Sequence, residues 1–309
     1  ALAYRSRFPD EDLQISPLLE KSGSFFIHTA YPAGDSLLSV NFGDSHLTAN
    51  GAKTIQLLRA FGIQTPGDAW YLSRTSWGLD DPLTLVYQDY APSQVLPDAP
   101  LEQRYGDIGW VMLRTGWDAD ATLLAVKSGV AWNHAHPDAN SFILFHGGKP
   151  LLIDSGDCSY NRPEYTGYYR KSMAHNVILT DGAAESPESC GGPDRGTVTS
   201  GEVSQLMNLD GIRYVLADAT GPTSWKFSRN YRHFLWIDEV ILILDDVRTH
   251  EAGQLEWLLH YEGTAKEQGN ELLIENGATS RAIVRPLFPP DPTLVWKKGL
   301  KDHDPDTEV

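Results

Sequence analysis

From about residue 106 onward, the chain consists of short apolar runs that glycine, aspartate and proline separate. Most runs are too short for helices and are rich in valine, isoleucine, leucine and aromatic residues, which is typical of β-strands. The pair Asp238-Glu239 separates two such runs and predicts a β-hairpin. About ten closely spaced strands without intervening helices predict a mainly β protein with a large antiparallel β-sandwich. The runs are IGWVMLRTG, ATLLAVKSG, NSFILFHG, PLLIDSG, HNVILTDG, GIRYVLADAT, YRHFLWID, EVILILDDV, GQLEWLLHYEG and RAIVRPL.

The first hundred residues have a different pattern, with apolar residues at helical spacing. Ala52, Ile55, Leu58 and Phe61 recur in this way, and the segments SPLLEKS, GDSHLTANGAKTIQLLRAFGI and TPGDAWYLSRTSWGL each predict a short helix. The segment YAPSQVLPDAP, residues 90–100, is rich in proline and polar residues and predicts a linker. We therefore expect a helical segment with a linker over residues 1–105 and the β-sandwich over residues 106–309.

Charge and composition argue against two classes of protein, those that bind nucleic acid and those that span a membrane. The 309 residues carry a net charge of −16, which argues against a nucleic-acid partner because such partners need basic surfaces. No run of about 18 apolar residues is present, so no membrane span is predicted. The chain shows no signal peptide, but it opens and closes as a fragment or processed product would, and we expect it to be one.

Residues 133–182 carry the strongest chemical signal. His134 and His136 are two residues apart and point the same way on an extended segment, while Asp154 ends one apolar run and His175 begins another. Two imidazoles and a carboxylate are a common ligand set for zinc and other divalent ions. We therefore predict that His136, Asp154 and His175 bind Zn²⁺ or another divalent ion, and that His134 is free to move protons. Asp138 competes as a ligand, although its place after Pro137 favours a turn residue.

Several other side chains are candidates for the same region. Tyrosines cluster after Asp154, and among them Tyr169 is predicted to relay protons. Arg170 is predicted to pair with a substrate carboxylate because a guanidinium matches a carboxylate in shape and charge. His260 lies among apolar residues on a predicted strand, and it is predicted either to face the substrate or to pack in the core. Cys158 and Cys190 lie 32 residues apart in a region rich in glycine and proline, and a disulfide between them is one alternative, although two cysteines alone say little about compartment.

The strings NHAHPDANSF, LLIDSG and YYRKSMAHNVILTDG, followed by WKFSRNYRHFLWIDEVILILDDV and EWLLHYEG, resemble the C-terminal sandwich of the heparinase II/III-like polysaccharide lyases. The resemblance covers about residues 40–265. It implies that an (α/α) toroid precedes the sandwich, that residues 1–95 are the end of that toroid, and that substrate binds between the two. By the same resemblance His136, Asp154 and His175 match zinc ligands and His134 faces substrate. Asn133 and Asn176 then flank them as amides that support the site or bind sugar.

The function implied by this resemblance is cleavage of a uronate-containing acidic polysaccharide by β-elimination, with a structural zinc site and a periplasmic or extracellular location. In that family the catalytic tyrosine and the Asn/His that neutralises the uronate belong to toroid helices, most of which would precede Ala1. We therefore expect this chain to lack part of the active site, which a missing toroid segment or an oligomer partner would complete. Heparan sulfate, chondroitin, hyaluronan and alginate all remain open as substrates, as do endo or exo action and C5 epimerisation. Two other readings are a non-catalytic, metal-stabilised carbohydrate-binding sandwich and an oxygenase with His136, Asp138 and a distal histidine as ligands.

Overall fold

The computed structural model describes residues 7, 16–75, 82, 93–129, 134, 136–185, 199–290, 292–301 and 304–308. The chain divides into two compact units. Unit 1 comprises Ala1–Val40, Thr48–Leu101 and Gly116–Ala119. Unit 2 comprises Asn41–Leu47, Glu102–Thr115 and Asp120–Val309. The sequence predicted a single boundary at residue 105. In the structure, the earlier segment Asn41–Leu47 belongs to unit 2, and the later segment Gly116–Ala119 belongs to unit 1.

Unit 1 contains helices and one hairpin. A helix lies in each of the three segments that were predicted to be helical, and Ser16 caps the first by accepting a hydrogen bond from the Leu18 backbone. The hairpin of β1 and β2 was not predicted; Gly34 turns it with a φ of 62°, which glycine adopts without strain. The elements are α2 (Pro17–Thr29), β1 (Ala30–Ala33), β2 (Ser36–Ser39), α3 (Ala52–Ala60) and α4 (Asp68–Leu72).

A buried carboxylate at the start of α4 makes the stability of the chain sensitive to pH. Burial raises the pKa of Asp68 to about 6, against the effects of the Thr65 backbone and Arg59. The folded state therefore holds this proton to a higher pH than the unfolded state does. Its contribution to stability is complete below about pH 4 and is lost as pH rises through the folded pKa. We expect Asp68→Asn to raise Tm relative to wild type by a margin that grows from about pH 4 to about pH 7.

Thermal unfolding followed by circular dichroism across this pH range checks the prediction. Asp35→Asn is the matched control, because Asp35 is exposed in the hairpin turn of the same unit. A difference between Asp68→Asn and wild type that stays constant with pH would contradict it.

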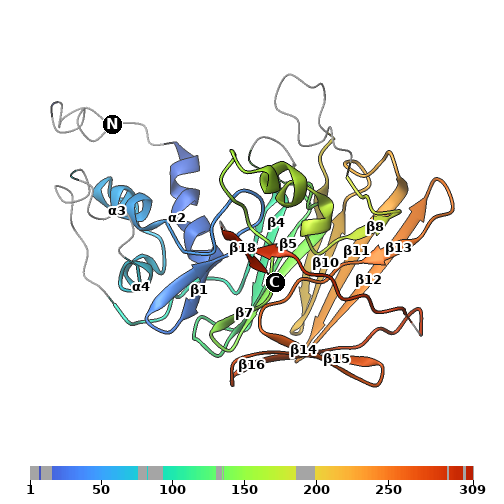
Figure 1. Ribbon diagram of the computed structural model, residues 1–309. Coiled ribbons are helices and arrows are strands. Elements are labelled where there is room, and N and C mark those ends of the chain that lie inside the picture. Colours follow the sequence, from blue (N-terminus) through green and yellow to red (C-terminus); the bar gives the residue numbers. More distant parts are fainter. Residues whose placement is uncertain are drawn as a thin grey trace. The chain divides into compact units, whose positions relative to one another are not determined.

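Unit 2 is built from antiparallel sheets, whose strands run from teal through green and orange to red in Figure 1. A five-stranded sheet has the order β3-β4-β5-β6-β7, and a four-stranded sheet has the order β12-β11-β10-β9. Smaller sheets are β14-β15-β16, β13-β8 and β17-β18. The strands are β3 (Glu102–Tyr105), β4 (Trp110–Arg114), β5 (Thr122–Lys127), β6 (Ser141–His146), β7 (Lys149–Leu152), β8 (Ile178–Thr180), β9 (Glu202–Leu209), β10 (Ile212–Asp218), β11 (Phe227–Ile237), β12 (Val240–Thr249), β13 (Leu255–Trp257), β14 (Thr264–Gln268), β15 (Glu271–Asn276), β16 (Ser280–Val284), β17 (Leu300–Lys301) and β18 (Asp304–Glu308).

One hydrophobic core joins the two large sheets. It contains Val111, Leu124 and Phe142 from the five-stranded sheet together with Val215 and Phe234 from the four-stranded sheet, all of them 1% exposed or less. A core shared by two antiparallel sheets defines a β-sandwich. The predicted fold class, a mainly β protein with a large antiparallel sandwich after a helical segment, is therefore confirmed.

The longest strand pair of unit 2 is the hairpin of β11 and β12. β11 and β12 form the predicted hairpin, in which Ile237 pairs with Val240 and Asp238 turns the chain with a φ of 50°. The same unit contains three short helical turns. The 3-10 turn η1 (Gly106–Ile108) lies between β3 and β4, and the π-helical turn η2 (Tyr165–Tyr169) and the 3-10 turn η3 (Ser172–Ala174) lie between β7 and β8.

Within the described part of the chain, none of the helices combines the length and the apolar character that a membrane crossing needs.

Candidate metal centre and adjoining pocket

The chain segments that were predicted to carry the site converge at one end of the five-stranded sheet. β6 begins at Ser141 and its antiparallel partner β7 ends at Leu152, so the residues before β6 and after β7 lie at the same end. Asn176 then ties in the third segment, because its side-chain amide donates to the backbone oxygens of Phe142 (2.8 Å) and Ile153 (2.9 Å). Residues far apart in sequence, near 138, 154 and 175, are thereby held together.

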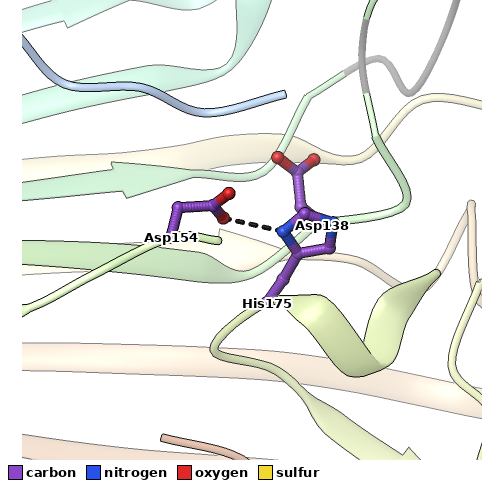
Figure 2. Close-up of side chains that lie close together, drawn as sticks. All are labelled: Asp138, Asp154 and His175. Carbon is purple, nitrogen blue, oxygen red and sulfur yellow. Dashed lines mark hydrogen bonds and ion pairs between the residues drawn. The ribbon is translucent and has the colours of Figure 1, made fainter. Parts of the chain in front are cut away.

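A buried cluster of Asp138, Asp154 and His175 occupies this end of the sheet (Figure 2). Each residue offers a potential ligand atom, and these atoms lie within 4.8 Å of one another. His175 Nδ1 donates to Asp154 Oδ2 at 2.7 Å. Burial lowers the pKa of His175, but the Asp154 carboxylate outweighs this effect and raises the pKa above its ordinary value. In the neutral form of the ring, the hydrogen bond to Asp154 fixes the single proton on Nδ1. The other ring nitrogen, Nε2, is left open to a ligand.

His136, the third residue of the predicted ligand set, lies next to this cluster. Its ring centroid is 5.4 Å from that of His175, and the residue is fully buried. Burial and the nearby positive charges of His175 and Lys127 hold the pKa of His136 well below its ordinary value. The imidazole is therefore neutral at physiological pH, which is the form that binds a metal.

Lys127 was not predicted to belong to the site. Its ammonium contacts Asp138 Oδ1, and both side chains are buried. An ion pair of this kind offsets the cost of burying Asp138, and it leaves Oδ2 as the open oxygen of that carboxylate. The turn-residue interpretation of Asp138 therefore misses its main contact.

The cluster has several polar atoms whose hydrogen-bonding capacity is not used. Among the described residues, His136 Nδ1 and Nε2, Asp138 Oδ2 and His175 Nε2 are buried without a hydrogen-bond partner. An unsatisfied buried polar group costs about 1–3 kcal/mol, so four of them in one place call for a ligand. A set of imidazole nitrogens and carboxylate oxygens matches the donors that zinc and similar divalent ions prefer. The residues present therefore fit a divalent ion.

An open pocket with a volume of about 510 Å³ lies in the same unit, and some of its lining residues are close in sequence to the cluster. It is lined by Asp44, His46, His134, Asp157, Cys158, Ser159 and Tyr160. The His134 side chain is 63% exposed, and its Nδ1 lies 2.7 Å from Asp44 Oδ2 and 2.7 Å from the Tyr160 hydroxyl. Of the predicted catalytic residues His134, Tyr169 and Arg170, His134 is the one that lines this pocket.

Asp44 was not singled out from the sequence, although it lies two residues before His46 in the segment GDSH. Partial burial raises the pKa of Asp44, but hydrogen bonds with Asp157, Tyr160 and His134 outweigh this and hold it at about 2. The same bond to Asp44 raises the pKa of the Tyr160 phenol. At neutral pH the pocket therefore contains an ionised Asp44 and a neutral Tyr160.

The tyrosine cluster lies beside the pocket, but Tyr169 does not reach it. Tyr169 is fully buried and packs with Cys158 and Tyr165 inside the turn η2. Tyr160 is the exposed member, and its ring stacks against Tyr165 with centroids 4.6 Å apart. Because a fully buried phenol cannot reach a sugar, we replace Tyr169 by Tyr160 as the candidate tyrosine.

The other predicted substrate residues have different surroundings. The Arg170 guanidinium lies over the Tyr165 ring, 5.6 Å from its centroid. Asn176 is fully buried, and its oxygen accepts from the His260 backbone at 2.6 Å, so its amide holds strands together and has no access to sugar. Removal from solvent lowers the pKa of His260 to about 4, and its ring contacts the same Asn176 oxygen. Asn133 lies outside the described residues, as does Cys190.

Arg232, on β11, holds the backbone near the cluster and was also not predicted. Its Nη1 donates to the backbone oxygens of Asn140 (2.8 Å) and Asn176 (2.6 Å). Its Nε and Nη2 bind both carboxylate oxygens of Asp245 on β12. The guanidinium thereby fixes the two chain segments that carry Asp138 and His175.

Comparison with known proteins agrees with this architecture. A heparin-sulfate lyase of Bacteroides stercoris is 24% identical over 274 residues, which are 86% of this chain and 35% of that protein. A heparin-sulfate lyase of Pedobacter heparinus is 26% identical over 129 residues, 37% of this chain and 20% of that protein. The chain thus spans about a third or less of the length of the curated relatives that it matches.

Solved structures extend the likeness to nearly the whole chain. A heparinase III structure with methylated lysines superposes with a TM-score of 0.70 at 17% identity, over 94% of this chain and 41% of that one. A mutant heparan sulfate lyase from Pedobacter heparinus gives a TM-score of 0.65 at 17% identity, over 92% and 41%. At this identity the likeness shows the fold. The profile described as Heparinase II/III-like, C-terminal, matches residues 98–286, more than half of the sequence, and the chain therefore belongs to that family.

Proposed function

We propose that this chain is part of a polysaccharide lyase that cleaves a uronate-containing glycosaminoglycan, of the heparan sulfate class, by β-elimination. The observation that carries the proposal is the exposed His134, which lines an open pocket and comes four residues before Asp138, a member of the buried cluster that could hold a metal ion. The names of the relatives, which are heparin-sulfate lyases, support the substrate class. A polymer of this kind would be met in the periplasm or outside the cell.

The chemistry needs a base and an acid but no redox partner. The base removes the C5 proton of the uronate, the electron pair forms the C4–C5 double bond, and the C4–O4 bond breaks. An acid then protonates O4 of the departing sugar. His134 suits proton transfer at C5 because its exposed imidazole has a ring nitrogen that can accept a proton, and the Tyr160 hydroxyl lies beside it for hydrogen bonding to sugar oxygens.

The metal in this proposal is structural. Zinc or another divalent ion, held by His175 and His136 with Asp154 and Asp138, would fix the segment between His134 and Asn140 when bound. The chain's own residues carry the proton transfers. Lys127 balances the charge of Asp138, and the Arg232 guanidinium holds the backbone on either side of the cluster.

The test is the formation of an unsaturated uronate from heparan sulfate, followed by the ultraviolet absorbance of its conjugated double bond. We expect purified protein that carries this chain to form it, and His134→Ala to lower kcat/KM by about a hundredfold, the lower end of what a proton-transfer residue contributes. His250→Ala is the matched control, because His250 is an exposed histidine of the same unit outside the pocket.

Release of only saturated reducing ends by the wild-type protein would overturn the lyase proposal. A second function is a sandwich that binds acidic sugar without cleaving it. It would be supported if uronate oligomers bind wild type and His134→Ala equally and the wild type turns none over.

A further inference from the structure

We propose that Asp44 is a positioning residue that fixes the tautomer and orientation of His134, so that His134 begins the reaction as the base at uronate C5. This inference deepens the proposed function and rests on it for the reaction. The arrangement itself rests on contacts within unit 2. Asp44 belongs to the segment Asn41–Leu47, which lies in that unit with the sandwich.

Two hydrogen bonds attach Asp44 to His134. Asp44 Oδ2 lies 2.7 Å from His134 Nδ1, and the Asp44 backbone N–H donates to the His134 carbonyl at 2.8 Å. The Asp44 side chain is 6% exposed, whereas the His134 side chain is 63% exposed. A buried and fixed carboxylate therefore holds one edge of a ring that is otherwise open to the pocket.

The chemistry of the carboxylate decides where the proton lies. An ionised carboxylate only accepts hydrogen bonds, so the neutral imidazole that faces it must carry its proton on Nδ1. Nε2 then has its lone pair free and is exposed with the rest of the ring. This is the form that accepts a proton, and the imidazolium that results is stabilised by Asp44.

Tyr160 helps to hold the carboxylate. Its hydroxyl donates to Asp44 Oδ2, the same oxygen that His134 approaches, and its ring is fixed by stacking on Tyr165. Asp44 is therefore held from a second side, and its orientation does not depend on His134 alone. This agrees with a carboxylate that positions the histidine and argues against one that His134 merely attracts.

The first experiment measures the tautomer, which does not require turnover. Nitrogen-15 chemical shifts of the His134 ring, recorded where the ring is uncharged, should show a protonated Nδ1 and an unprotonated Nε2 in wild type. In Asp44→Asn the side-chain amide can donate to Nδ1, so the shifts should move toward the Nε2-protonated form. A wild-type ring protonated on Nε2, or identical shifts in the variant, would overturn the inference.

The second experiment measures its consequence for catalysis. Asp44→Asn should lower kcat by about a hundredfold with little change in KM, as expected for a residue that acts through the base. In the His134→Ala background the same change should cost less than about twofold, because the two residues act as a unit. Asp246→Asn, an exposed carboxylate paired with Arg229, is the control.

The outcomes separate this inference from the proposed function. Additive losses in the double variant would assign Asp44 a merely structural role and overturn the inference. If the wild type forms no unsaturated product, the lyase proposal fails, while the ring shifts still decide whether Asp44 sets the His134 tautomer.

Discussion

Replacing Arg232 by methionine is expected to lower the free energy of unfolding by about 3–5 kcal/mol, the cost of leaving one partner of a buried ion pair without the other. Arg232 is fully buried, and its guanidinium binds both oxygens of Asp245 and two backbone carbonyl groups. Methionine fills much of the same volume but supplies none of these donors. Asp245 and the carbonyl groups of Asn140 and Asn176 would then remain desolvated.

Arg229→Met is the matched control, since Arg229 lies on the same strand and pairs with Asp246 at 2.8 Å. That pair is exposed on both sides, and an exposed ion pair contributes only about 0–1 kcal/mol. Denaturant unfolding of both variants measures the difference. Equal losses would mean that Arg232 contributes no more than a surface charge and that the support of the cluster lies elsewhere.

The sandwich could be predicted because its central strands are buried on one face or both. The apolar runs of β4, β5, β6, β10, β11 and β12 all form strands, and Asp238 makes the expected turn. Three of the missed strands, β3, β9 and β14, lie at the edge of their sheet, whereas the missed β15 is the central strand of its sheet. An edge strand needs only one paired neighbour and tolerates polar side chains, so its apolar signal is weak. Sequences such as EQRY and TAKEQ therefore read as loops.

The buried site could be predicted only in part, for a related reason. Asp154 and His175 were recognisable because each lies next to an apolar run, and the structure joins them by a hydrogen bond of 2.7 Å. Lys127 and Asp44 matter through partners that are 11 and 90 residues away, Asp138 and His134. Nothing in the local pattern around either residue reveals such a partner. A lysine at the end of a strand is normally solvated, and an aspartate after glycine normally belongs to a turn.

Removing a divalent ion from the cluster is expected to lower the free energy of unfolding by about as much as Arg232→Met does. A ligand that binds only the folded state, present at about a thousand times its Kd, stabilises it by about 4 kcal/mol. We therefore expect about one equivalent of zinc or a similar ion per chain, and a fall in Tm when a chelator is added. His175→Ala should abolish this binding, because His175 contributes an open buried nitrogen to the centre of the cluster.

Metal content is measured on the folded, purified protein by elemental analysis, and Tm is measured with and without chelator. His233→Ala is the control: its ring also makes one side-chain hydrogen bond in the sandwich, to Tyr214, but it lies outside the cluster. A wild-type protein that holds no ion and whose Tm does not rise with added zinc would remove the basis for a metal site.

The remaining ligands can be separated by the same measurement. In the structure Asp154 Oδ2 accepts a hydrogen bond from His175 Nδ1, and Oδ1 accepts one from the Gly156 backbone at 2.9 Å. Asp154 therefore has the contacts of a residue that orients His175, and its loss as an orienting partner should weaken metal affinity by about 10–100-fold. If Asp154→Asn instead abolishes binding while Asp138→Asn retains it, the ligands are His136, Asp154 and His175. The opposite result would identify Asp138 as the carboxylate ligand, because its free Oδ2 would then be the oxygen that binds the ion.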